Sequence, residues 1–336
     1  MPPLRIGTLG AARITPSALV KPVRRVPEVE VVAVAARDRD RADRFARKHG
    51  IPNVHGSYAE LIDDPSVDAV YNPLPNGLHG HWTLAALDAG KPVLCEKPLT
   101  ANADEAEAVA RAAASRGLVV MEAFHYRYHP LMARVLEIVR DGELGALRRV
   151  ATQACIPLPF RGDIRYQLDL AGGAVMDIGC YAIHQARTLA GQEPEVTGSS
   201  AKTVSPGVDR WLRADLRFSD ALTGSFECAL WSAKLIRMNA TVEGDLGTLR
   251  VTNLTAPQYY HRLVVRRRDP ETGAERRRRE RVKGEATYVY QLRAFVAAVR
   301  EGAPYPTTTA DSVANMRVVD ASYRAAGLEP RQPTPA

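Results

Sequence analysis

The sequence predicts an α/β protein of two domains, in which a doubly wound parallel sheet is followed by a second α/β domain with a mainly antiparallel sheet. Three observations predict this fold class. The 336 residues exceed the length of one ordinary domain. Strand-like and helix-like segments alternate over residues 1–122, as in a parallel sheet covered on both faces. Beyond residue 195, strand-like runs follow one another without helices, which indicates antiparallel pairing.

The composition is that of an ordinary globular protein, with 46% hydrophobic and 25% charged residues. No apolar run reaches the roughly 18 residues of a membrane span. The first residues lack the apolar core of a signal peptide. The four cysteines are far apart in the chain and form no CxxC pair: Cys95, Cys155, Cys180 and Cys228. We therefore expect reduced thiols in a cytoplasmic protein, with no membrane partner, no disulfide frame and no metal site.

The net charge of +7 comes almost entirely from one segment. Residues 1–122 balance 15 basic against 15 acidic residues, whereas residues 261–284 contain 10 basic and 4 acidic ones. In that segment, Leu263–Arg268 and Ala274–Arg279 flank a Pro/Gly turn. This pattern predicts a solvated edge hairpin, whose arginines oppose pairing with other strands. Nucleic-acid binding is the alternative, but no aromatic residues alternate with the arginines and no DNA-binding motif accompanies them, so we expect no nucleic-acid partner.

The chain opens with a strand that ends in glycine. Residues 4–10 form this strand, and Gly7-Thr8-Leu9-Gly10-Ala11-Ala12 is a variant of the G-x-G-x-x-G pattern. Small residues at such a turn let the backbone approach a pyrophosphate at the N-terminus of the following helix, expected at 14–25. A β-branched and alanine run at 29–36 predicts the next strand, buried on both faces. This strand–turn–helix unit indicates a dinucleotide site.

The end of the second strand indicates which dinucleotide binds. An NAD-binding chain usually has an acidic residue there for the ribose 2′-hydroxyl. Here Ala36 is followed by Arg37, and Arg13 and Arg41 are further cations nearby. An arginine can pair with a 2′-phosphate and stack on adenine. The sequence therefore favours NADP(H), while Asp38, one residue later, leaves NAD(H) as the alternative.

A lysine follows a short predicted strand of the alternating region. The apolar run Val93–Cys95 is followed at once by Glu96, Lys97 and Pro98. Proline disfavours helix at the residue before it, so Lys97 is expected in an extended segment at the carboxyl end of the strand. Open α/β sheets bind their ligands at this end. Lys97 is therefore a candidate catalytic cation, and a surface lysine after an edge strand is the alternative.

The remaining elements complete the two domains. We expect the dinucleotide domain to span 1–122, with a loop at 73–79 on the ligand-binding edge of its sheet, and a second domain to span 123–329. The tail 330–336 is expected to be loose. Helices are expected at 38–49, 57–62, 79–88, 102–116, 131–140, 287–300 and 310–326, and strands at 67–72, 118–121, 147–155, 195–204, 211–218, 222–230, 237–243 and 247–251. A glycine-rich loop at 172–173 leads into a helix that contains Asp177, Tyr181 and His184.

Several motifs in this order resemble one family. They are Gly7-Thr-Leu-Gly-Ala-Ala-Arg13, Pro73-Leu-Pro-Asn76 with His79, Cys95-Glu-Lys-Pro-Leu99, Glu122-Ala-Phe-His-Tyr-Arg127-Tyr-His-Pro130 and Gly172-Gly with Asp177-Ile-Gly-Cys-Tyr181. The sequence resembles the glucose–fructose oxidoreductase/inositol dehydrogenase (Gfo/Idh/MocA) family over essentially its whole length. The resemblance implies an N-terminal Rossmann domain, a C-terminal α/β domain with an open, mainly antiparallel sheet, and a homodimer or homotetramer formed through that sheet.

The resemblance also implies catalytic roles. Family members transfer a hydride between a nicotinamide and a carbinol carbon, and the tyrosine of Asp-x-Gly-x-Tyr, here Tyr181, moves the hydroxyl proton. A tyrosine has an ordinary pKa near ~10, and an ammonium such as Lys97 would favour its phenolate. Lys97 could also polarise a carbonyl in the reverse reaction. Asp177 is assigned to orienting the substrate or Lys97. An ordinary core tyrosine is the alternative for Tyr181.

Other candidate residues line the nucleotide or the substrate. Arg127 is expected near the nicotinamide, or in an ion pair between the domains. Glu96 is expected to hold the ribose or to position Lys97, and His79 lines the cofactor or caps a helix. Three residues are candidates for the substrate wall, of which His184 could equally be a satisfied buried histidine. The full cofactor set is Gly7, Gly10, Ala11, Ala12, Arg13, Ala36, Arg37, Arg41, Leu74, Pro75, Asn76, His79, Glu96, Lys97 and Arg127, and the substrate set is Arg165, Tyr166 and His184.

Two classes of function follow. The first is an NADP(H)-dependent oxidoreductase acting on a sugar, deoxysugar, cyclic polyol or dihydrodiol. The second is a non-catalytic sensor or co-regulator that binds the dinucleotide and a partner protein. Lys97 and Tyr181 favour the enzyme, because a pure sensor has no need of a proton donor. The glucose–fructose branch carries an export signal and a cofactor-clamping arm, which are not expected here, so freely exchanged cofactor is predicted.

Overall fold

The computed structural model describes residues 1–160, 162–231, 236–269 and 271–335. The chain forms two compact units. The first contains Met1–His125, Tyr288–Val313 and Gln332–Ala336, and the second contains Tyr126–Thr287 and Ala314–Arg331. The chain first passes from one unit to the other between His125 and Tyr126, close to the predicted boundary at residue 122. Segment 288–313 was predicted to belong to the second domain, 123–329, but it packs with the first unit.

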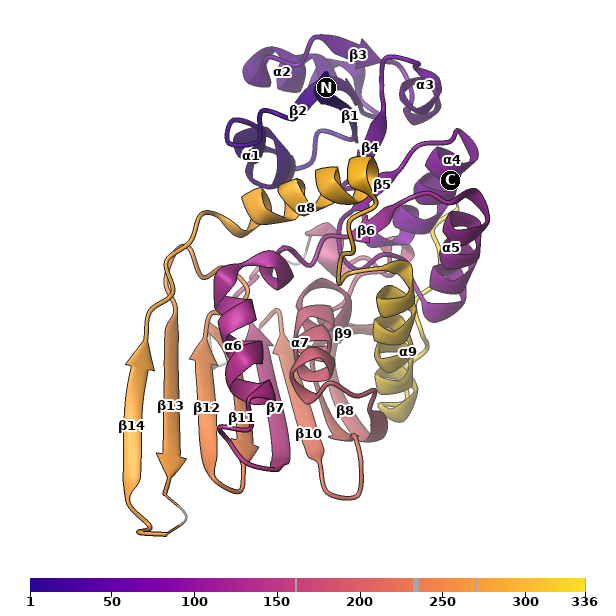
Figure 1. The fold of residues 1–336 in the computed structure, drawn as a ribbon. Coiled ribbons are helices and arrows are strands. Elements are labelled where there is room, and N and C mark those ends of the chain that lie inside the picture. The colour runs from indigo at the N-terminus through magenta and orange to yellow at the C-terminus, as the bar shows by residue number, and fades with distance from the viewer. Residues whose placement is uncertain (161, 232–235, 270, 336) are drawn as a thin grey trace. The chain divides into compact units, whose positions relative to one another are not determined.

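The first unit contains a six-stranded parallel sheet (Figure 1). Its strand order is β3-β2-β1-β4-β5-β6, so the order reverses between β1 and β4. In such sheets, ligands bind outside the carboxyl ends of the strands at this switch point. The predicted doubly wound sheet is confirmed. Its strands are β1 (Leu4–Leu9), β2 (Val29–Ala35), β3 (Asn53–His55), β4 (Ala69–Asn72), β5 (Val93–Cys95) and β6 (Val120–Glu122).

The helices of this unit begin and end at residues suited to the role. Asp38 caps α2 by accepting from the Arg41 amide, and Ser57 caps α3 by accepting from the Glu60 amide. Asn102 caps α5, which ends at Gly117 in the left-handed conformation. The helices are α1 (Lys21–Val23), which continues a π-helical turn at Pro16–Val20, α2 (Arg39–His49), α3 (Tyr58–Asp63), α4 (His79–Asp88), α5 (Ala103–Arg116) and α8 (Thr287–Glu301).

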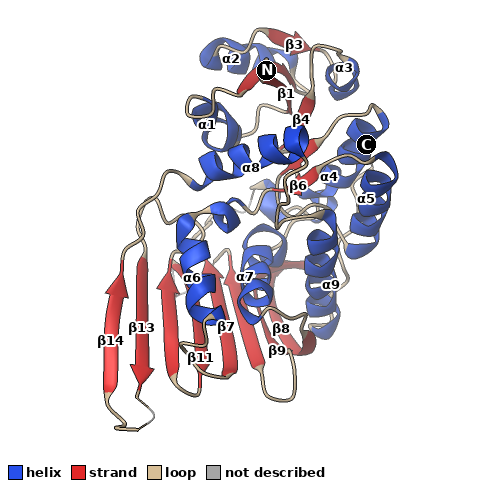
Figure 2. Cartoon of the chain, in the orientation of Figure 1, coloured by secondary structure: helices blue, strands red, loops and turns tan. Residues whose placement is uncertain are grey.

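The second unit contains an open eight-stranded sheet with β14 and β8 as its edges (Figure 2). Its order is β14-β13-β12-β11-β7-β10-β9-β8, and only the β7–β10 pair is parallel among the pairs described. The predicted open, mainly antiparallel sheet is confirmed. Its strands are β7 (Leu147–Cys155), β8 (Glu195–Ser205), β9 (Val208–Arg217), β10 (Thr223–Ala229), β11 (Arg237–Gly244), β12 (Gly247–Thr252), β13 (Arg262–Arg268) and β14 (Glu275–Glu280).

Helices of the second unit lie on one face of this sheet (Figure 1). They are α6 (Pro130–Arg140), α7 (Cys180–Ala190) and α9 (Thr309–Ala325), whose first residues belong to the first unit. A π-helical turn at Val175–Gly179 precedes α7, and Gly179 allows it to pack closely, because a Cβ there would lie 2.8 Å from the Cys228 Sγ. The glycine-rich loop therefore enters a helix as predicted, but through a wide turn.

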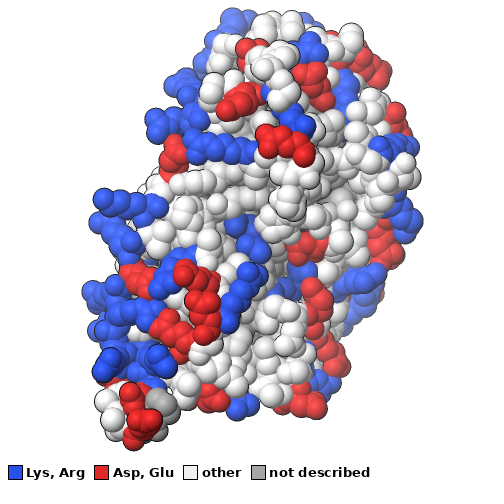
Figure 3. All heavy atoms as spheres, viewed as in Figure 1, with Lys and Arg blue, Asp and Glu red and all other residues white. Residues whose placement is uncertain are grey.

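The basic segment forms the predicted hairpin at a sheet edge. β13 and β14 pair antiparallel, with Arg266 opposite Arg277. Figure 3 shows Lys and Arg side chains gathered over this hairpin, with acidic side chains beside them. Glu280 accepts from Arg134 at 2.7 Å and from Arg278 at 2.7 Å, which offsets part of the repulsion. Pro270 of the predicted turn lies outside the described residues.

The expectation of a loose tail is wrong at Arg331. This side chain is 2% exposed and forms an ion pair with Asp209 at 2.7 Å. Its charge is compensated by a buried carboxylate that belongs to β9, a partner that sequence reasoning could not foresee. Farther on, the Thr334 amide donates to the Gly77 carbonyl within the first unit at 2.8 Å. Ala336 lies outside the described residues.

Two further features concern membrane-spanning helices and disulfides. Among the described residues, no helix is both long and apolar enough to cross a membrane. All four cysteines are described, and they are buried thiols that form no disulfide.

Candidate functional site

The glycine turn after β1 is built for close approach of a ligand to the backbone. Gly10 has a φ of +84°, where a side chain is strained, and a Cβ there would lie 3.2 Å from Leu74 Cδ2. A Cβ on Gly7 would lie 2.7 Å from Leu61, so this glycine lets α3 pack on β1. Ala11 and Ala12 continue the turn with small side chains. The turn fits the pyrophosphate of a dinucleotide.

Three arginines surround the end of β2. Arg13, Arg37 and Arg41 are exposed, and Arg41 donates from Nη2 to the Ala11 carbonyl at 2.8 Å. Ala36 is buried beside them. Asp38 accepts from the Arg41 amide at 3.0 Å and caps α2. Because its carboxylate is bound to this helix terminus, Asp38 is less suited to a ribose hydroxyl than Arg37 is to a phosphate.

His79 joins two loops at the carboxyl edge of the sheet. Its Nε2 lies 2.6 Å from the Leu74 carbonyl and its Nδ1 lies 2.7 Å from the Pro98 carbonyl. The ring is 1% exposed. His79 therefore fixes the loop after β4 to the loop after β5, rather than presenting its ring to a ligand. Pro75 and Asn76 are half-buried on the first of these loops.

The loop that carries Lys97 is fixed on either side of the lysine. Glu96 is buried and accepts from the Tyr71 hydroxyl at 2.9 Å. The Leu99 amide donates to Glu122 Oε1 at 2.9 Å. Lys97 itself is half-buried. The bond to Tyr71 therefore holds the residue directly before Lys97.

The charge of Lys97 acts on two buried imidazoles. Burial lowers the pKa of His79 to about 4, although hydrogen bonds to two carbonyls oppose this and Lys97 adds to it. Burial lowers the pKa of His125 to about 3, again with Lys97 acting in the same direction. Both rings are therefore neutral at pH 7 and add no positive charge to that of Lys97.

In the second unit, Asp177 is held by an arginine. Arg165 Nε lies 3.0 Å from Asp177 Oδ2, and Arg165 Nη1 lies 3.0 Å from Asp163 Oδ1. The attraction of Asp177 is the largest cause of a raised pKa of Arg165. Arg165 was expected in the substrate wall, and its two ion pairs make it a residue that positions Asp177. Asp177 lies in the π-helical turn that precedes α7. The four residues from Asp177 to Tyr181 therefore begin in a helix that is wider than an α-helix.

Tyr181 lies in a buried aromatic group. It is 5% exposed, and its ring centroid is 6.2 Å from that of Tyr126. The Tyr126 hydroxyl and His184 Nδ1 are 2.5 Å apart, and both residues are buried. His184 is thus the satisfied buried histidine that was the alternative to a substrate contact.

The second unit also contains a cavity of about 440 Å³. Of the three expected substrate residues, only Tyr166 lines it. The other residues that line it were missed, because they lie near the ends of separate strands and share no motif: Leu158, Pro159, Thr203, Val204, Arg210 and Trp231. The one available signal was Trp231, an aromatic residue directly after a predicted strand.

Two expectations concern ions. Arg127 lies half-buried in the 3-10 turn His125–Tyr128 and forms no ion pair with any residue the structure describes. In the described ranges, no group of three His, Cys, Asp or Glu side chains is placed to hold a metal ion.

Comparisons with known proteins agree with this geometry. Residues 4–124 match the family described as "Oxidoreductase family, NAD-binding Rossmann fold", and residues 132–250 match the "GFO/IDH/MocA C-terminal domain". D-xylose 1-dehydrogenase (NADP(+)) 2 of Haloferax volcanii is 37% identical over 96% of this chain and 97% of that protein. The dTDP-3,4-didehydro-2,6-dideoxy-α-D-glucose 3-reductase of Streptomyces antibioticus is 36% identical over 90% of each chain.

A solved structure is similar over nearly the whole chain. The crystal structure of a 3-ketoreductase from Actinomadura kijaniata, in complex with NADP and TDP-benzene, has a TM-score of 0.87 and 32% identity. The similarity covers 96% of this chain and 98% of that one. The resemblance stated from the motifs is confirmed: the chain is an oxidoreductase that belongs to the GFO/IDH/MocA family.

Proposed function

We propose that this protein is an NADP(H)-dependent oxidoreductase that transfers a hydride between the nicotinamide and a carbinol or carbonyl carbon of a sugar, deoxysugar, cyclic polyol or dihydrodiol. The observation that carries the proposal is the fixed loop after β5, which holds Lys97 at the ligand-binding edge of the sheet. Both full-length relatives compared above act on sugars or nucleotide-linked deoxysugars, as their names state.

The choice of NADP(H) rests on residues and on relatives. The xylose dehydrogenase is named for NADP(+), and the ketoreductase structure contains NADP. In this chain, Arg37 is exposed at the end of β2 and Arg41 is bound to the glycine turn, where both can reach a 2′-phosphate. Asp38 is bound to the helix terminus. Arg13 is a third cation for the same phosphate.

The remaining cofactor assignments are proposals with different support. Gly7, Gly10, Ala11 and Ala12 would hold the pyrophosphate, since the turn offers backbone amides without side chains in the way. Leu74, Pro75 and Asn76 would line the nucleotide from the loop after β4. Arg127, half-buried and without an ion pair among the described residues, would approach the nicotinamide.

We propose that Lys97, Tyr181 and Asp177 carry the chemistry. When bound, the nicotinamide accepts or supplies the hydride. Tyr181 takes the proton of the reacting hydroxyl in oxidation and returns it to the carbonyl oxygen in reduction. Lys97 favours the tyrosinate and donates a hydrogen bond to the same substrate oxygen. Asp177, fixed by Arg165, orients the substrate. Glu96 positions Lys97 through its bond to Tyr71.

We further propose a homodimer or homotetramer formed through the eight-stranded sheet. The sheet is open, with β14 and β8 as its edges. The arginines of β14 oppose pairing with another strand, so the subunits would associate through a face of the sheet and not through this edge. Light scattering of the full chain tests this. A monomer at micromolar concentration would contradict it. The cytoplasmic location stays a prediction.

The test of function is nicotinamide absorbance with NADP+ and NAD+ in parallel, across aldoses, cyclic polyols and dihydrodiols, and with NADPH for ketosugars. Lys97→Ala and Tyr181→Phe are compared with the unchanged protein, and binding of NADPH, followed by fluorescence, shows whether each variant still holds the cofactor. We expect turnover that prefers NADP(H) and is lost in both variants. Turnover that survives both would overturn the site assignment. NADPH binding without turnover on any substrate would favour the sensor.

A further inference from the structure

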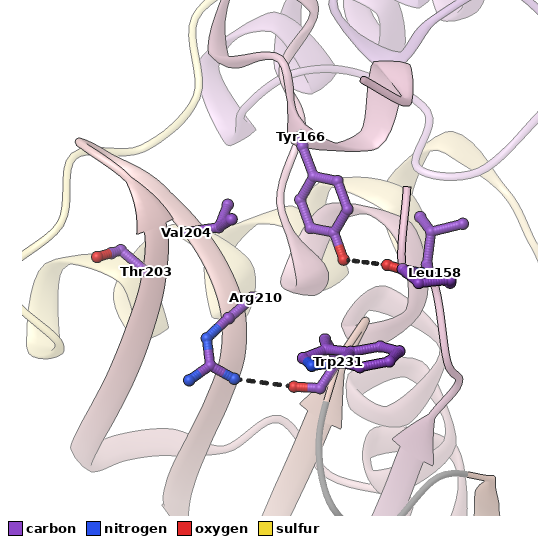
Figure 4. A pocket seen from close by; sticks show the side chains of 7 residues that line it. Leu158, Tyr166, Thr203, Val204, Arg210 and Trp231 are labelled. Carbon is purple, nitrogen blue, oxygen red and sulfur yellow. Dashed lines mark hydrogen bonds between the residues drawn. The ribbon is translucent and has the colours of Figure 1, made fainter. Parts of the chain in front are cut away.

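A cavity in the second unit offers a positive charge and two aromatic faces. It measures about 440 Å³ and is lined by residues from the ends of β8 and β9, from the segments that follow β7 and β10, and from the 3-10 turn Ile164–Tyr166. Figure 4 shows the Tyr166 ring, the Trp231 ring and the Arg210 guanidinium around one opening. A cavity of this size holds a small organic ligand.

Arg210 is the charged group of this cavity, and its charge is not neutralised. The other arginines of β9 have carboxylate partners, since Arg213 lies 3.4 Å from Asp215 and Arg217 pairs with Glu195. Arg210 forms no ion pair within the part of the chain that the structure describes. Its neighbour Asp209 is fully buried and pairs with Arg331. The cavity therefore has a net positive character.

The guanidinium of Arg210 is held in place by a backbone group. Its Nη1 donates to the Trp231 carbonyl at 3.0 Å (Figure 4). This bond uses one of the five N–H donors of the side chain. The remaining donors can take an anion without first giving up a carboxylate. A guanidinium held in this way is suited to phosphate oxygens, which it can bind through two parallel hydrogen bonds.

The two aromatic residues offer ring faces rather than polar groups. The Tyr166 hydroxyl donates to the Leu158 carbonyl at 2.7 Å, so this polar group is already satisfied. The Trp231 side chain is 47% exposed, which is unusual for a residue so large. An exposed indole beside a cation can stack on a sugar or on a planar base.

The cavity is connected to the proposed catalytic segment of the same unit. Tyr166 follows Arg165, which binds Asp177 at 3.0 Å. Arg210 follows Asp209, whose Oδ2 accepts from the Val175 amide at 2.9 Å, at the start of the turn that carries Asp177. Both lining residues are thus covalent neighbours of residues that hold this turn. The cavity thus lies in the same part of the second unit as this turn.

We propose that this cavity binds a phosphate-bearing substituent of the substrate, with Arg210 pairing with the phosphate and Trp231 stacking on the adjoining ring. The inference rests on the proposed function and deepens it, because it selects phosphorylated or nucleotide-linked sugars over neutral ones. The two sources share one chemistry, a phosphate ester next to a ring, and the test separates them.

The experiment measures binding by titration calorimetry on the full chain saturated with NADPH. The ligands are glucose, glucose 1-phosphate, TDP and TDP-glucose, and the variants are Arg210→Gln and Trp231→Ala. Arg213→Gln is the matched control, since Arg213 lies on the same strand but pairs with Asp215. We expect phosphorylated ligands to bind more tightly than glucose. Arg210→Gln should weaken them about tenfold or more, whereas Arg213→Gln should not.

The outcomes separate the source of the phosphate and the fate of the proposal. Equal binding of glucose 1-phosphate and TDP-glucose supports a sugar phosphate, and binding of TDP and TDP-glucose alone supports a linked nucleotide with its base on Trp231. Equal binding of glucose and the charged ligands, or equal losses in Arg210→Gln and Arg213→Gln, overturns the proposal. Turnover of neutral sugars without binding of the phosphorylated ligands supports the proposed function and overturns the phosphate site. Arg210-dependent binding without turnover of any substrate supports the phosphate site and contradicts the proposed function.

Discussion

Arg331 and Asp209 form a buried ion pair of 2.7 Å across 122 residues of sequence. Arg331 Nε also donates to the Gly172 carbonyl at 2.6 Å, and its guanidinium lies 4.0 Å from the Tyr323 ring centroid. Burial raises the pKa of Asp209, and Arg331 opposes this most strongly among the residues near it. The pair thus joins a C-terminal residue to the glycine-rich loop that precedes Asp177.

Loss of this ion pair is expected to destabilise the protein strongly. Arg331→Met would leave the Asp209 carboxylate buried without its cation, at a cost of about 3–5 kcal/mol in the free energy of unfolding. Urea titration followed by circular dichroism measures this. Arg324→Met, on the exposed side of α9, is the control and should change the free energy little. Equal urea midpoints for the two variants would contradict the expectation.

The local signals in the sequence predicted much of the fold. The helix expected at 102–116 is α5, because single residues define its ends: Asn102 caps its start and Gly117 follows its last residue. The alternation of strands and helices predicted the parallel sheet, and the uninterrupted strands predicted the second sheet. The burial of Arg331 could not be predicted, since its partner Asp209 is distant in the sequence and nothing local links them.

The candidate site divides in the same way. Lys97 and the glycine turn follow directly from motifs next to predicted strands. The structural roles of His79 and Arg165 were not predicted. They depend on contacts with the Leu74 carbonyl and with Asp177 that only the folded chain creates. Arg210 and Trp231 were missed for a related reason: a cavity wall assembled from several strand ends carries no spacing signal along the chain.

Nucleotide preference is expected to depend on Arg37. Arg37→Ser should lower the ratio of kcat/KM for NADP+ to that for NAD+ by about ten- to hundredfold, since it removes a charge-assisted hydrogen bond to the 2′-phosphate. Steady-state kinetics with both cofactors measure the ratio. Arg39→Ser is the control, because Arg39 is exposed and lies 3.4 Å from Asp43. An unchanged ratio in Arg37→Ser would show that another cation selects the phosphate.

Asp38 is expected to serve the helix and not the ribose. Asp38→Ala should cost about 1 kcal/mol of stability, because the Arg41 amide loses its cap. The NADP+/NAD+ ratio should stay as it is. Thermal unfolding and the same kinetic assay measure both effects. A selective loss of NAD+ turnover in Asp38→Ala would instead identify its carboxylate as the ribose ligand.

The pair Tyr126 and His184 is expected to stabilise the packing around Tyr181. Tyr126→Phe removes the hydroxyl that lies 2.5 Å from His184 Nδ1 and leaves a buried ring nitrogen without that partner. The expected cost is about 1–3 kcal/mol. A double-mutant cycle with His184→Leu measures the coupling. If the two single losses simply add, the hydrogen bond makes no contribution of its own to stability.

Glu105 is expected to make stability depend on pH. It is packed against α4, where a Cβ on Gly80 would lie 2.2 Å from its Cδ, and burial raises its pKa to about 6 from 4.5. The folded state therefore binds this proton more tightly than the unfolded state. The resulting stabilisation is complete below pH 4.5 and is lost as the pH rises through 6, a change of about 2 kcal/mol.

Glu105→Gln removes this titration while keeping an oxygen for the Ala101 amide, which donates to Glu105 at 2.8 Å. Relative to the unchanged protein, the variant should gain about 2 kcal/mol in the free energy of unfolding between pH 4.5 and pH 7.5. Urea titrations at both pH values measure this difference, in which the titration of all other groups cancels. A constant difference for Glu105→Gln would mean that Glu105 has the same pKa in the folded and unfolded protein, and that its contact with α4 leaves enough solvent to keep the charge.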